Sequence, residues 1–247
     1  CSFNVKPGSE RTYVSISGLA ENMPKAIALF EKLMADAQVN APAYTNLVGD
    51  ILKSRVDAKA NQGTNFSQLR QYVTWGPEIK KTIPSAQELQ TANPQELVDR
   101  IHNIFSYKHR ILYYGPASEK ELIALLDKEH RTPETLKDIP AGVELKQANT
   151  EETKIFVAPY DAKQIYMSQF SHRNEKYDIN IEPTRQMYSE YFSGGMNSIV
   201  FQEMRESRGL AYTAYAGLAS PSFQKYDYTF ISYIATQNDK MMDAIKA

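Results

Sequence analysis

The sequence predicts an α+β fold, in which strands and helices follow one another in mixed order. Segments whose apolar and polar residues alternate with period two, such as Tyr13–Ser17, are typical of half-buried strands. Other segments carry apolar residues every three or four positions, which is typical of amphipathic helices. The 247 residues are 42% hydrophobic and 23% charged, an ordinary globular composition that allows one large or two modest domains.

In the first half of the chain, strands are expected at both ends of a series of helices. Two strands joined by a turn at Pro7-Gly8-Ser9 open the chain, and a further strand lies before Gly115. Ser85–Glu88 and Asn93–Glu96 both have the spacing of capping boxes, and Ser118–Glu121 also caps a helix. The expected strands are Ser2–Val5, Arg11–Leu19 and Arg110–Tyr114. The expected helices are Met23–Asp36, one opened by Pro42 that continues to Val56, Asn65–Val73, one starting at Asn93 and one starting at Ser118.

In the second half of the chain, a new structural unit is expected to begin at Lys154. Residues 131–153 lose periodicity and gain Pro, Thr and alternating charge, which is typical of a linker. The strands expected after this linker are Lys154–Tyr160, Ile165–Phe170, Leu210–Leu218 and Tyr226–Ala235. The helices expected there begin at Glu182-Pro183, after Gly195 and near Asn238.

A strand, an asparagine and a helix occur in the same order near both ends of the chain. The two stretches are Thr12–Ile27 and Tyr228–Ile245, and Asn22 and Asn238 lie 216 residues apart, about the size of one domain. Any junction between a strand and a helix can look like this, so chance similarity stays open. If the repeat is real, the chain contains the second half of one domain (1–130), a linker (131–153) and the first half of the next domain (154–247).

Composition excludes several classes of partner. The net charge of −1 gives no field that favours nucleic acid, and no apolar run approaches the roughly 18 residues of a membrane span. The N-terminal residues show no signal peptide. The single cysteine excludes an internal disulfide and a cysteine zinc site, and it leaves the cellular compartment open. Cys1 fits a lipidated terminus or, as we favour, a point inside a longer chain, because Phe3 and Val5 alternate like residues within a strand.

Residues 192–212 predict a corner between a helix and a strand. Gly194-Gly195 breaks the preceding helix, Asn197 or Ser198 caps a new one, and Gly209 ends it. Arg205 then lies on the last helical turn and Tyr212 at the start of the strand. Both have an ordinary structural explanation, because an arginine there offsets the helix dipole and a tyrosine there packs at the edge of a core.

The stretch from Gly194 to Tyr212 resembles a known family signature. It reads Gly-Gly-Met-Asn-Ser-Ile-Val-Phe-Gln-Glu-Met-Arg-Glu-Ser-Arg-Gly-Leu-Ala-Tyr. It is similar, without gaps, to the signature in the C-terminal half of pitrilysin/insulysin-type zinc metallopeptidases, the inverzincins. The resemblance implies tandem α+β domains, each an antiparallel sheet with helices mainly on one face, and places this chain in the non-catalytic half.

By that resemblance, Arg205 and Tyr212 hold the backbone carbonyl of the substrate and stabilise the oxyanion when water adds. Arg208 is the alternative arginine, and Ser207 stands where many relatives have lysine. A guanidinium and a phenolic hydroxyl are both donors suited to an oxyanion hole. We prefer Arg205 because an arginine at a helix end and a tyrosine at a strand start can converge on one point.

The chain lacks the zinc motif of the family. None of the four histidines, His102, His109, His130 and His172, has the His-x-x-Glu-His spacing, and no glutamate occurs in Ala43–Ser54, where the third ligand would lie. We therefore expect no cofactor in this chain and a zinc ion in another domain of the parent protein. The first half then resembles a degenerate third domain and the second half a fourth domain.

The resemblance implies two partners, a peptide substrate and the N-terminal zinc-bearing domains of the same parent chain. Incomplete sheets with open edges also predict either two separate lobes or self-association through those edges. The alternative function is a catalytically inactive scaffold or peptide-binding subunit of the same fold. The two functions differ in whether the parent protein carries His-x-x-Glu-His.

Overall fold

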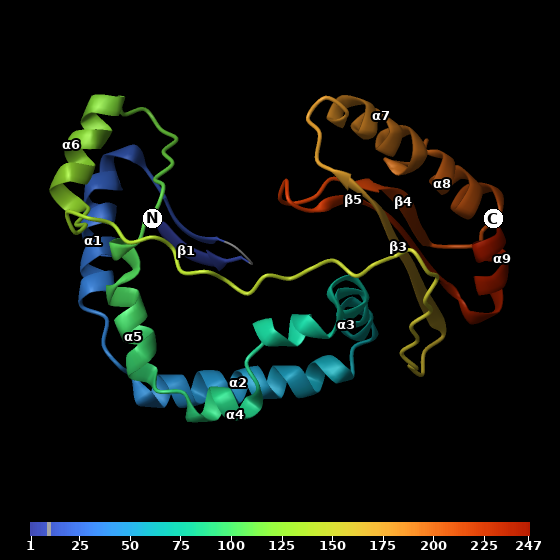
Figure 1. Ribbon diagram of the computed structural model, residues 1–247, viewed down its shortest axis with the longest axis horizontal. Helices are drawn as coiled ribbons and strands as arrows, with labels where there is room; N and C mark the ends of the chain where they lie inside the picture. The colour runs from blue at the N-terminus through green and yellow to red at the C-terminus, as the bar shows by residue number, and fades with distance from the viewer. Residues whose placement is uncertain (9–10) are drawn as a thin grey trace. The chain divides into compact units, whose positions relative to one another are not determined.

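The computed structural model describes residues 1–8 and 11–247, and the contacts within it define two compact units (Figure 1). Unit 1 comprises Cys1–Leu52 and Pro84–Val143, and unit 2 comprises Lys53–Ile83 and Glu144–Ala247. Each unit has its own antiparallel sheet and its own helices. The two units are described separately below.

The sheet of unit 1 is a single pair of strands. β1 (Ser2–Pro7) runs antiparallel to β2 (Thr12–Ser17), with Val5 opposite Val14, as the alternating pattern predicts. Of the predicted turn Pro7-Gly8-Ser9, Ser9 lies outside the described residues. The backbone N–H of Gly8 donates to the carbonyl of Arg11 at 2.8 Å, which begins the return of the chain.

The helices of unit 1 begin where the capping signals predict. Ser85 and Ser118 both form complete capping boxes, with Glu88 and Glu121 respectively. The backbone N–H of each serine donates to its glutamate, and this bond is the main reason why the pKa of each carboxyl lies below its ordinary value. Asn93 only accepts from the N–H of Gln95, so the capping box predicted there is wrong and only a simple N-cap remains. The helices are η1 (Ala20–Asn22), α1 (Met23–Ala35), α2 (Ala41–Lys59, which continues into unit 2), α4 (Ala86–Thr91), α5 (Pro94–His102), η3 (Ile104–Ser106) and α6 (Glu119–Glu129).

The sheet of unit 2 has three antiparallel strands in the order β3-β5-β4. β5 (Asp227–Gln237) lies in the centre, between β3 (Gln164–Lys176) and β4 (Thr213–Ala219). Its helices are α3 (Gln62–Trp75), η2 (Gly76–Thr82), α7 (Glu182–Ser193), α8 (Ile199–Phe201), the π-helical η4 (Gln202–Ser207), η5 (Asn238–Lys240) and α9 (Met241–Lys246).

Most helices of unit 2 pack on one face of this sheet, which confirms the predicted fold class. Ala214 and Ile234 face the same side and pack against a core of Met204, Ala211 and Ala244, which come from η4, the corner and α9. α7 and α8 lie along this face, while α3 contacts the sheet from the other side (Figure 1). On that side the ring of Phe66 contacts the rings of Tyr166 and Tyr233.

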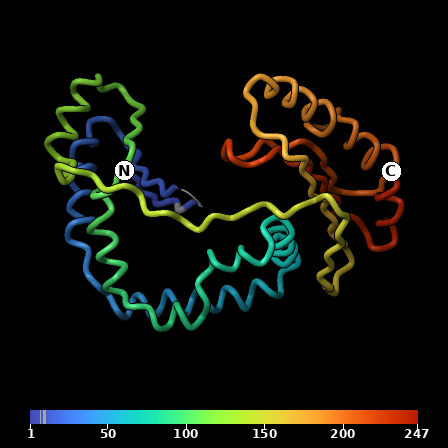
Figure 2. Tube along the Cα trace, in the orientation of Figure 1, coloured from blue at the N-terminus to red at the C-terminus, as the bar shows by residue number. Residues whose placement is uncertain are grey.

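Two predicted strands are wrong, because neither Arg110–Tyr114 nor Lys154–Tyr160 adopts strand structure. Figure 2 shows the second segment as an extended path without helical turns. The apolar residues of both segments are exposed; Leu112, for example, is 79% exposed and Ile155 is 85% exposed. An alternating pattern reports local preference, but a strand also needs a neighbour that accepts its backbone hydrogen bonds.

The contacts divide the chain differently from the sequence pattern. Residues 53–83 group with unit 2, although they precede the predicted linker, and the boundary after Val143 lies inside that linker. The N–H of Ala148 donates to the carbonyl of Thr74 at 2.8 Å, and this hydrogen bond joins the predicted linker to α3. The assignment of 1–130 and 154–247 to two half-domains of a repeat stays a prediction.

Both stretches of the predicted repeat consist of a strand, a 3₁₀ turn and an α-helix. The helix begins one residue after Asn22 but three residues after Asn238. Within the described part of the chain, every helix is too short or too polar to cross a membrane.

Candidate active-site corner

The corner is built by capping residues that start and stop a short helix. α7 ends at Gly194, whose N–H donates to the carbonyl of Glu190 at 2.9 Å. The Ser198 side chain then caps α8 by accepting from the N–H of Phe201. Gly209 has φ +55°, a left-handed conformation that favours glycine and turns the chain towards β4. These are the residues that the sequence predicts for the turns.

The helix of the corner is wider than predicted. The sequence predicts one amphipathic α-helix, but only Ile199–Phe201 is α-helical and Gln202–Ser207 is π-helical. The carbonyl of Met204 accepts from the N–H groups of both Leu210 and Ala211, at 2.8 and 3.2 Å. π-Helical turns occur often at functional sites, and Arg205 lies within this one.

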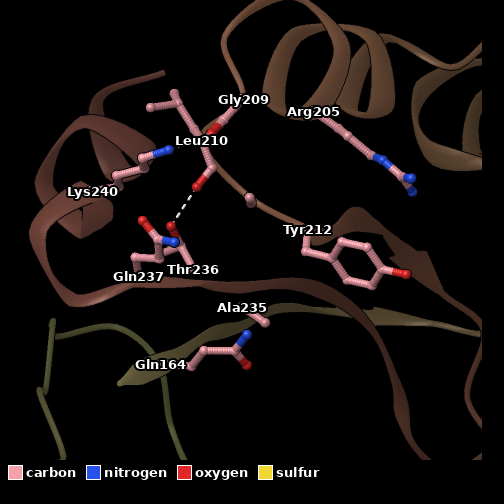
Figure 3. Close-up of a pocket in the computed structure, with 10 residues that line it drawn as sticks. Gln164, Arg205, Gly209, Leu210, Tyr212, Ala235, Thr236, Gln237 and Lys240 are labelled. Atoms are coloured by element: carbon pink, nitrogen blue, oxygen red, sulfur yellow. Dashed lines mark hydrogen bonds between the residues drawn. The ribbon is translucent and has the colours of Figure 1, made fainter. Parts of the chain in front are cut away.

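Arg205 and Tyr212 lie side by side at the corner. The guanidinium carbon of Arg205 is 5.0 Å from the centroid of the Tyr212 ring and 5.0 Å from that of the Phe201 ring. The Tyr212 residue is 76% exposed and the Arg205 side chain 44% exposed. Figure 3 shows both side chains extending in the same direction, so that the guanidinium and the phenol end near each other. The predicted convergence of the two side chains is therefore present.

The alternative arginine makes a different contact. Arg208 donates to the carboxylate of Glu203 at 3.1 Å, an exposed ion pair on the surface of η4. The ion pair that Arg205 forms among the described residues is longer, 3.7 Å from Nε to the carboxylate of the neighbouring Glu206. Of the two arginines, Arg205 is the one that contacts Tyr212.

A pocket of about 400 Å³ lies beside this pair (Figure 3). Lys240, the last residue of η5, lines the pocket and donates to the carbonyl of Gly209 at 3.1 Å. The hydroxyl of Thr236 donates to the carbonyl of Leu210. The complete lining is Gln164, Arg205, Gly209, Leu210, Ala211, Tyr212, Ala235, Thr236, Gln237 and Lys240. Its charged side chains, Arg205 and Lys240, are both cationic, so the pocket favours electron-rich or anionic groups.

A buried polar network holds α7, the helix before the corner, on the sheet. The Tyr228 hydroxyl donates to Glu182 at 2.7 Å, Ser220 donates at 3.0 Å and Arg185 at 3.2 Å, while Arg185 also donates to the carbonyl of Leu218 at 2.7 Å. The Tyr228 bond, aided by Arg185 and Ser220, lowers the pKa of Glu182 although burial raises it. Burial, and then Glu182, raises the pKa of Tyr228. The network fixes α7 against β4 and β5.

The histidines that the sequence analysis considered are held by neighbouring groups. His102 contacts the carbonyl of Ala37 through Nε2 at 2.9 Å, and His172 lies 3.0 Å from Asp227 in the sheet of unit 2. His109 and His130 contact each other. In residues 1–8 and 11–247, no group of three His, Cys, Asp or Glu side chains has the arrangement of a metal site. The site of the family's catalytic zinc is therefore not formed by the described residues.

Comparisons with known proteins identify the family. Residues 91–247 match the family described as the peptidase M16 inactive domain, and the chain belongs to this family. The predicted pitrilysin-type family, and the assignment of this chain to its non-catalytic C-terminal half, are thereby confirmed. A search of curated proteins finds no significant match.

Solved structures of low sequence identity share the fold. A peptidase M16 inactive domain from Pseudomonas fluorescens is 15% identical with a TM-score of 0.68, and the match covers 99% of this chain and 62% of that one. The periplasmic protease PqqL from Escherichia coli is 13% identical with a TM-score of 0.73 and coverages of 99% and 27%. A protease from Helicobacter pylori is 12% identical with a TM-score of 0.62 and coverages of 95% and 58%. The chain thus spans less than two thirds of these proteins.

Sequence reasoning missed three features of the corner. The π-helical widening has no recognisable sequence signal, because α- and π-helices share the same residue preferences. Phe201 lies under Arg205, and no local pattern in the sequence predicts this contact. Lys240 is the last residue of η5 and reaches the pocket only because β5 leads there. A comparison of strand ends would have been needed to find it.

Proposed function

We propose that this chain supplies substrate-binding and oxyanion-stabilising residues to a zinc-dependent endopeptidase whose metal site lies in another part of the parent polypeptide. The observation that carries this proposal is the exposed contact between Arg205 and Tyr212, at the edge of a pocket, in a chain of the M16 family. Both residues occupy the positions that the family signature assigns to this role.

The chemistry of the pair fits a developing negative charge. When water adds to a peptide bond, the carbonyl oxygen becomes an oxyanion and gains strength as a hydrogen-bond acceptor. A guanidinium lying over an aromatic ring keeps its N–H donors at the edge of its plane, and the phenol supplies an O–H donor. Donors that strengthen their bonds in the transition state raise kcat rather than only tightening substrate binding.

Zinc belongs to the proposed parent enzyme and not to this corner. A catalytic zinc ion polarises a carbonyl and lowers the pKa of a bound water molecule. Arg205 and Tyr212 are hydrogen-bond donors and do not fit the nitrogen and oxygen ligands that zinc requires. Their part is to bind and orient the carbonyl group of the substrate.

The proposed partners are a peptide substrate and the zinc-bearing N-terminal domains of the same parent chain. β3 and β4 are the edge strands of the sheet in unit 2, and each has a side without a strand neighbour among the described residues. In the parent protein these edges would be covered by the rest of the domain. In the separate chain they favour self-association, which light scattering across a concentration series would detect as a rise in mass; a constant monomer mass would contradict it.

The test of the catalytic role uses the zinc-bearing parent protein. Arg205→Ala and Tyr212→Phe should each lower kcat for peptide hydrolysis by about 10²–10³-fold, since removal of one oxyanion donor typically has this effect. Arg208→Ala is the matched control, because Arg208 directly follows the helix that carries Arg205 but pairs with Glu203. Unchanged hydrolysis in both test variants would remove the assigned role.

An inactive scaffold or peptide-binding subunit is the second candidate. The same two donors bind a peptide carbonyl in its ground state, so the pair also suits binding without hydrolysis. A parent without His-x-x-Glu-His that binds peptides, and loses this binding in Arg205→Ala, would establish the second candidate instead of the first.

A further inference from the structure

Unit 1 contains a pair of histidines whose ring nitrogens face each other. His109 follows η3, and His130 is the residue that ends α6. Their Nε2 atoms are 2.9 Å apart, and the ring planes are nearly perpendicular at 87°. The His130 side chain is mostly buried, whereas His109 is exposed, so solvent reaches the pair from the His109 side.

The other nitrogen of each ring contacts a group that only accepts hydrogen bonds. Nδ1 of His130 lies 2.6 Å from the carboxylate of Glu31 on α1. Nδ1 of His109 lies 2.7 Å from the carbonyl of Tyr107. A carboxylate and a carbonyl both require a donor, so each Nδ1 carries its proton. Both Nε2 atoms therefore carry a lone pair, and the two atoms lie 2.9 Å apart.

Two facing lone pairs repel each other unless a cation lies between them. Such a cation is either an extra proton shared by the rings or a metal ion. Metal-binding histidines almost always donate their second ring N–H to a carboxylate or a backbone carbonyl, which orients the ring. Glu31 and the Tyr107 carbonyl are placed in these two positions, and the Phe105 ring, 4.8 Å from that of His130, restricts the rotation of His130.

We propose that His109 and His130 bind a divalent transition-metal ion through their Nε2 atoms, with Cu²⁺ preferred. Bonds of about 2.0 Å from two nitrogens 2.9 Å apart meet at an angle of about 90°. This is the angle between neighbouring ligands in tetragonal Cu²⁺ and Ni²⁺ sites and is smaller than the tetrahedral angle of zinc. Cu²⁺ also binds nitrogen ligands more tightly than the neighbouring divalent ions. Water would complete the coordination from the exposed side.

Carboxylates offset part of the positive charge beside the pair. Glu31 is a mostly buried carboxylate that adds negative charge behind His130. Lys108, next to His109, is balanced by Asp138 at 2.5 Å, and Lys128 on α6 by Glu129 at 3.0 Å. The metal would join α6 to the segment after η3, and through Glu31 to α1, so binding should also stabilise unit 1. The histidine pair belongs to unit 1, whereas Arg205 and Tyr212 belong to unit 2.

The test measures Cu²⁺ binding to the full chain, prepared without a histidine tag. Cys1 is an exposed free thiol that binds and reduces copper, so every variant carries Cys1→Ser. Titration calorimetry should give one ion per chain, with release of a proton at low pH, and electron paramagnetic resonance should show coupling to two imidazole nitrogens. His109→Ala and His130→Ala should each weaken binding at least about tenfold, and Glu31→Ala should weaken it about 10–100-fold through the orientation of His130.

His102→Ala is the matched control, because its ring contacts only the carbonyl of Ala37 in the described part of the chain. This variant should bind copper like the parent sequence. Circular dichroism and melting curves without metal identify any variant that fails to fold. If Glu31→Ala fails to fold, Glu31→Gln, which retains an acceptor oxygen, replaces it. Absence of stoichiometric binding would leave only a shared proton and would overturn the proposal. An affinity for Cu²⁺ in the His109→Ala and His130→Ala variants that equals the affinity of the chain with both histidines would also overturn it.

Discussion

Two arginine–tyrosine groups in unit 2 differ in their burial and in their hydrogen-bond partners. Arg185 and Tyr228 are buried, with the Arg185 side chain 14% exposed and Tyr228 2% exposed, and both donate to Glu182. Arg205 and Tyr212 are largely exposed and contact each other through a cation and a ring face. The first group has its donors satisfied by the protein itself. The second keeps donors available to a ligand.

This difference separates a structural role from a binding role for the same residue types. Donors that already have partners stabilise the fold. Removing them would leave the buried carboxylate of Glu182 without donors that balance its charge. Donors at an exposed corner add little to stability, so we expect Arg205 and Tyr212 to contribute more to binding than to folding. The predictions below test whether activity and stability separate in this way, from the largest effect to the smallest.

The largest expected difference is between the two arginines. In the zinc-bearing parent, Arg205→Ala should lower kcat about 10²–10³-fold while the melting temperature stays nearly unchanged. Arg185→Ala should do the reverse: it lowers the melting temperature by several degrees, because a buried carboxylate loses its ion pair. Peptide hydrolysis and differential scanning calorimetry on both variants provide the measurement. Similar changes in kcat and in melting temperature for the two variants would contradict the difference between a binding role and a structural role.

Substitution of the two tyrosines should also affect stability differently, with a smaller change in melting temperature than for the arginines. Tyr228→Phe removes the strongest of the bonds that lower the pKa of Glu182, so the melting temperature should fall. Tyr212→Phe removes an exposed hydroxyl that has no hydrogen-bond partner among the described residues, so the melting temperature should not change. A stabilising role for the Tyr212 hydroxyl would appear as an equal decrease in both variants.

The buried network also predicts a pH dependence. The folded state lowers the pKa of Glu182 below its ordinary value of 4.5, so this carboxylate stabilises the fold above that pH. The stabilisation should be lost as the pH falls from about 4.5 through the lower pKa of the folded state. Glu182→Gln should remove this part of the acid dependence of the melting temperature, measured from about pH 3 to about pH 7. A variant with an unchanged slope would contradict the assigned pKa shift.

The smallest effect is expected for the alternative arginine. Arg208 forms an exposed ion pair with Glu203, and such pairs contribute about 0–1 kcal/mol. Arg208→Ala should therefore change neither the melting temperature nor peptide hydrolysis appreciably. A loss of hydrolysis comparable with that of Arg205→Ala would show that both arginines contact the substrate.

Local signals in the sequence predicted the turns of the corner well. Ser198, Gly194 and Gly209 act through their own backbone and side-chain chemistry, which does not depend on distant residues. For the same reason the capping box at Ser85 and the helix cap at Ser118 were predicted correctly. The family signature then directed attention to Arg205 and Tyr212, whose contact the structure contains.

Features that depend on distant residues were not predicted. Arg110–Tyr114 and Lys154–Tyr160 have strand-like patterns, yet hydrogen bonding as a strand depends on a neighbour that the pattern does not contain. The Glu182, Arg185 and Tyr228 network joins positions 46 residues apart, and only the sheet brings them together. Likewise, His109 and His130 lie 21 residues apart and meet only when α6 packs on α1.

A double-mutant cycle on peptide hydrolysis tests the central proposal most directly. It compares kcat/KM for the zinc-bearing parent, Arg205→Ala, Tyr212→Phe and the double variant. If both donors bind the same oxyanion, each single variant loses about 10²-fold or more and the double variant loses clearly less than the product of the two. Losses that multiply independently, or the absence of any loss, would contradict a shared role at one reacting atom.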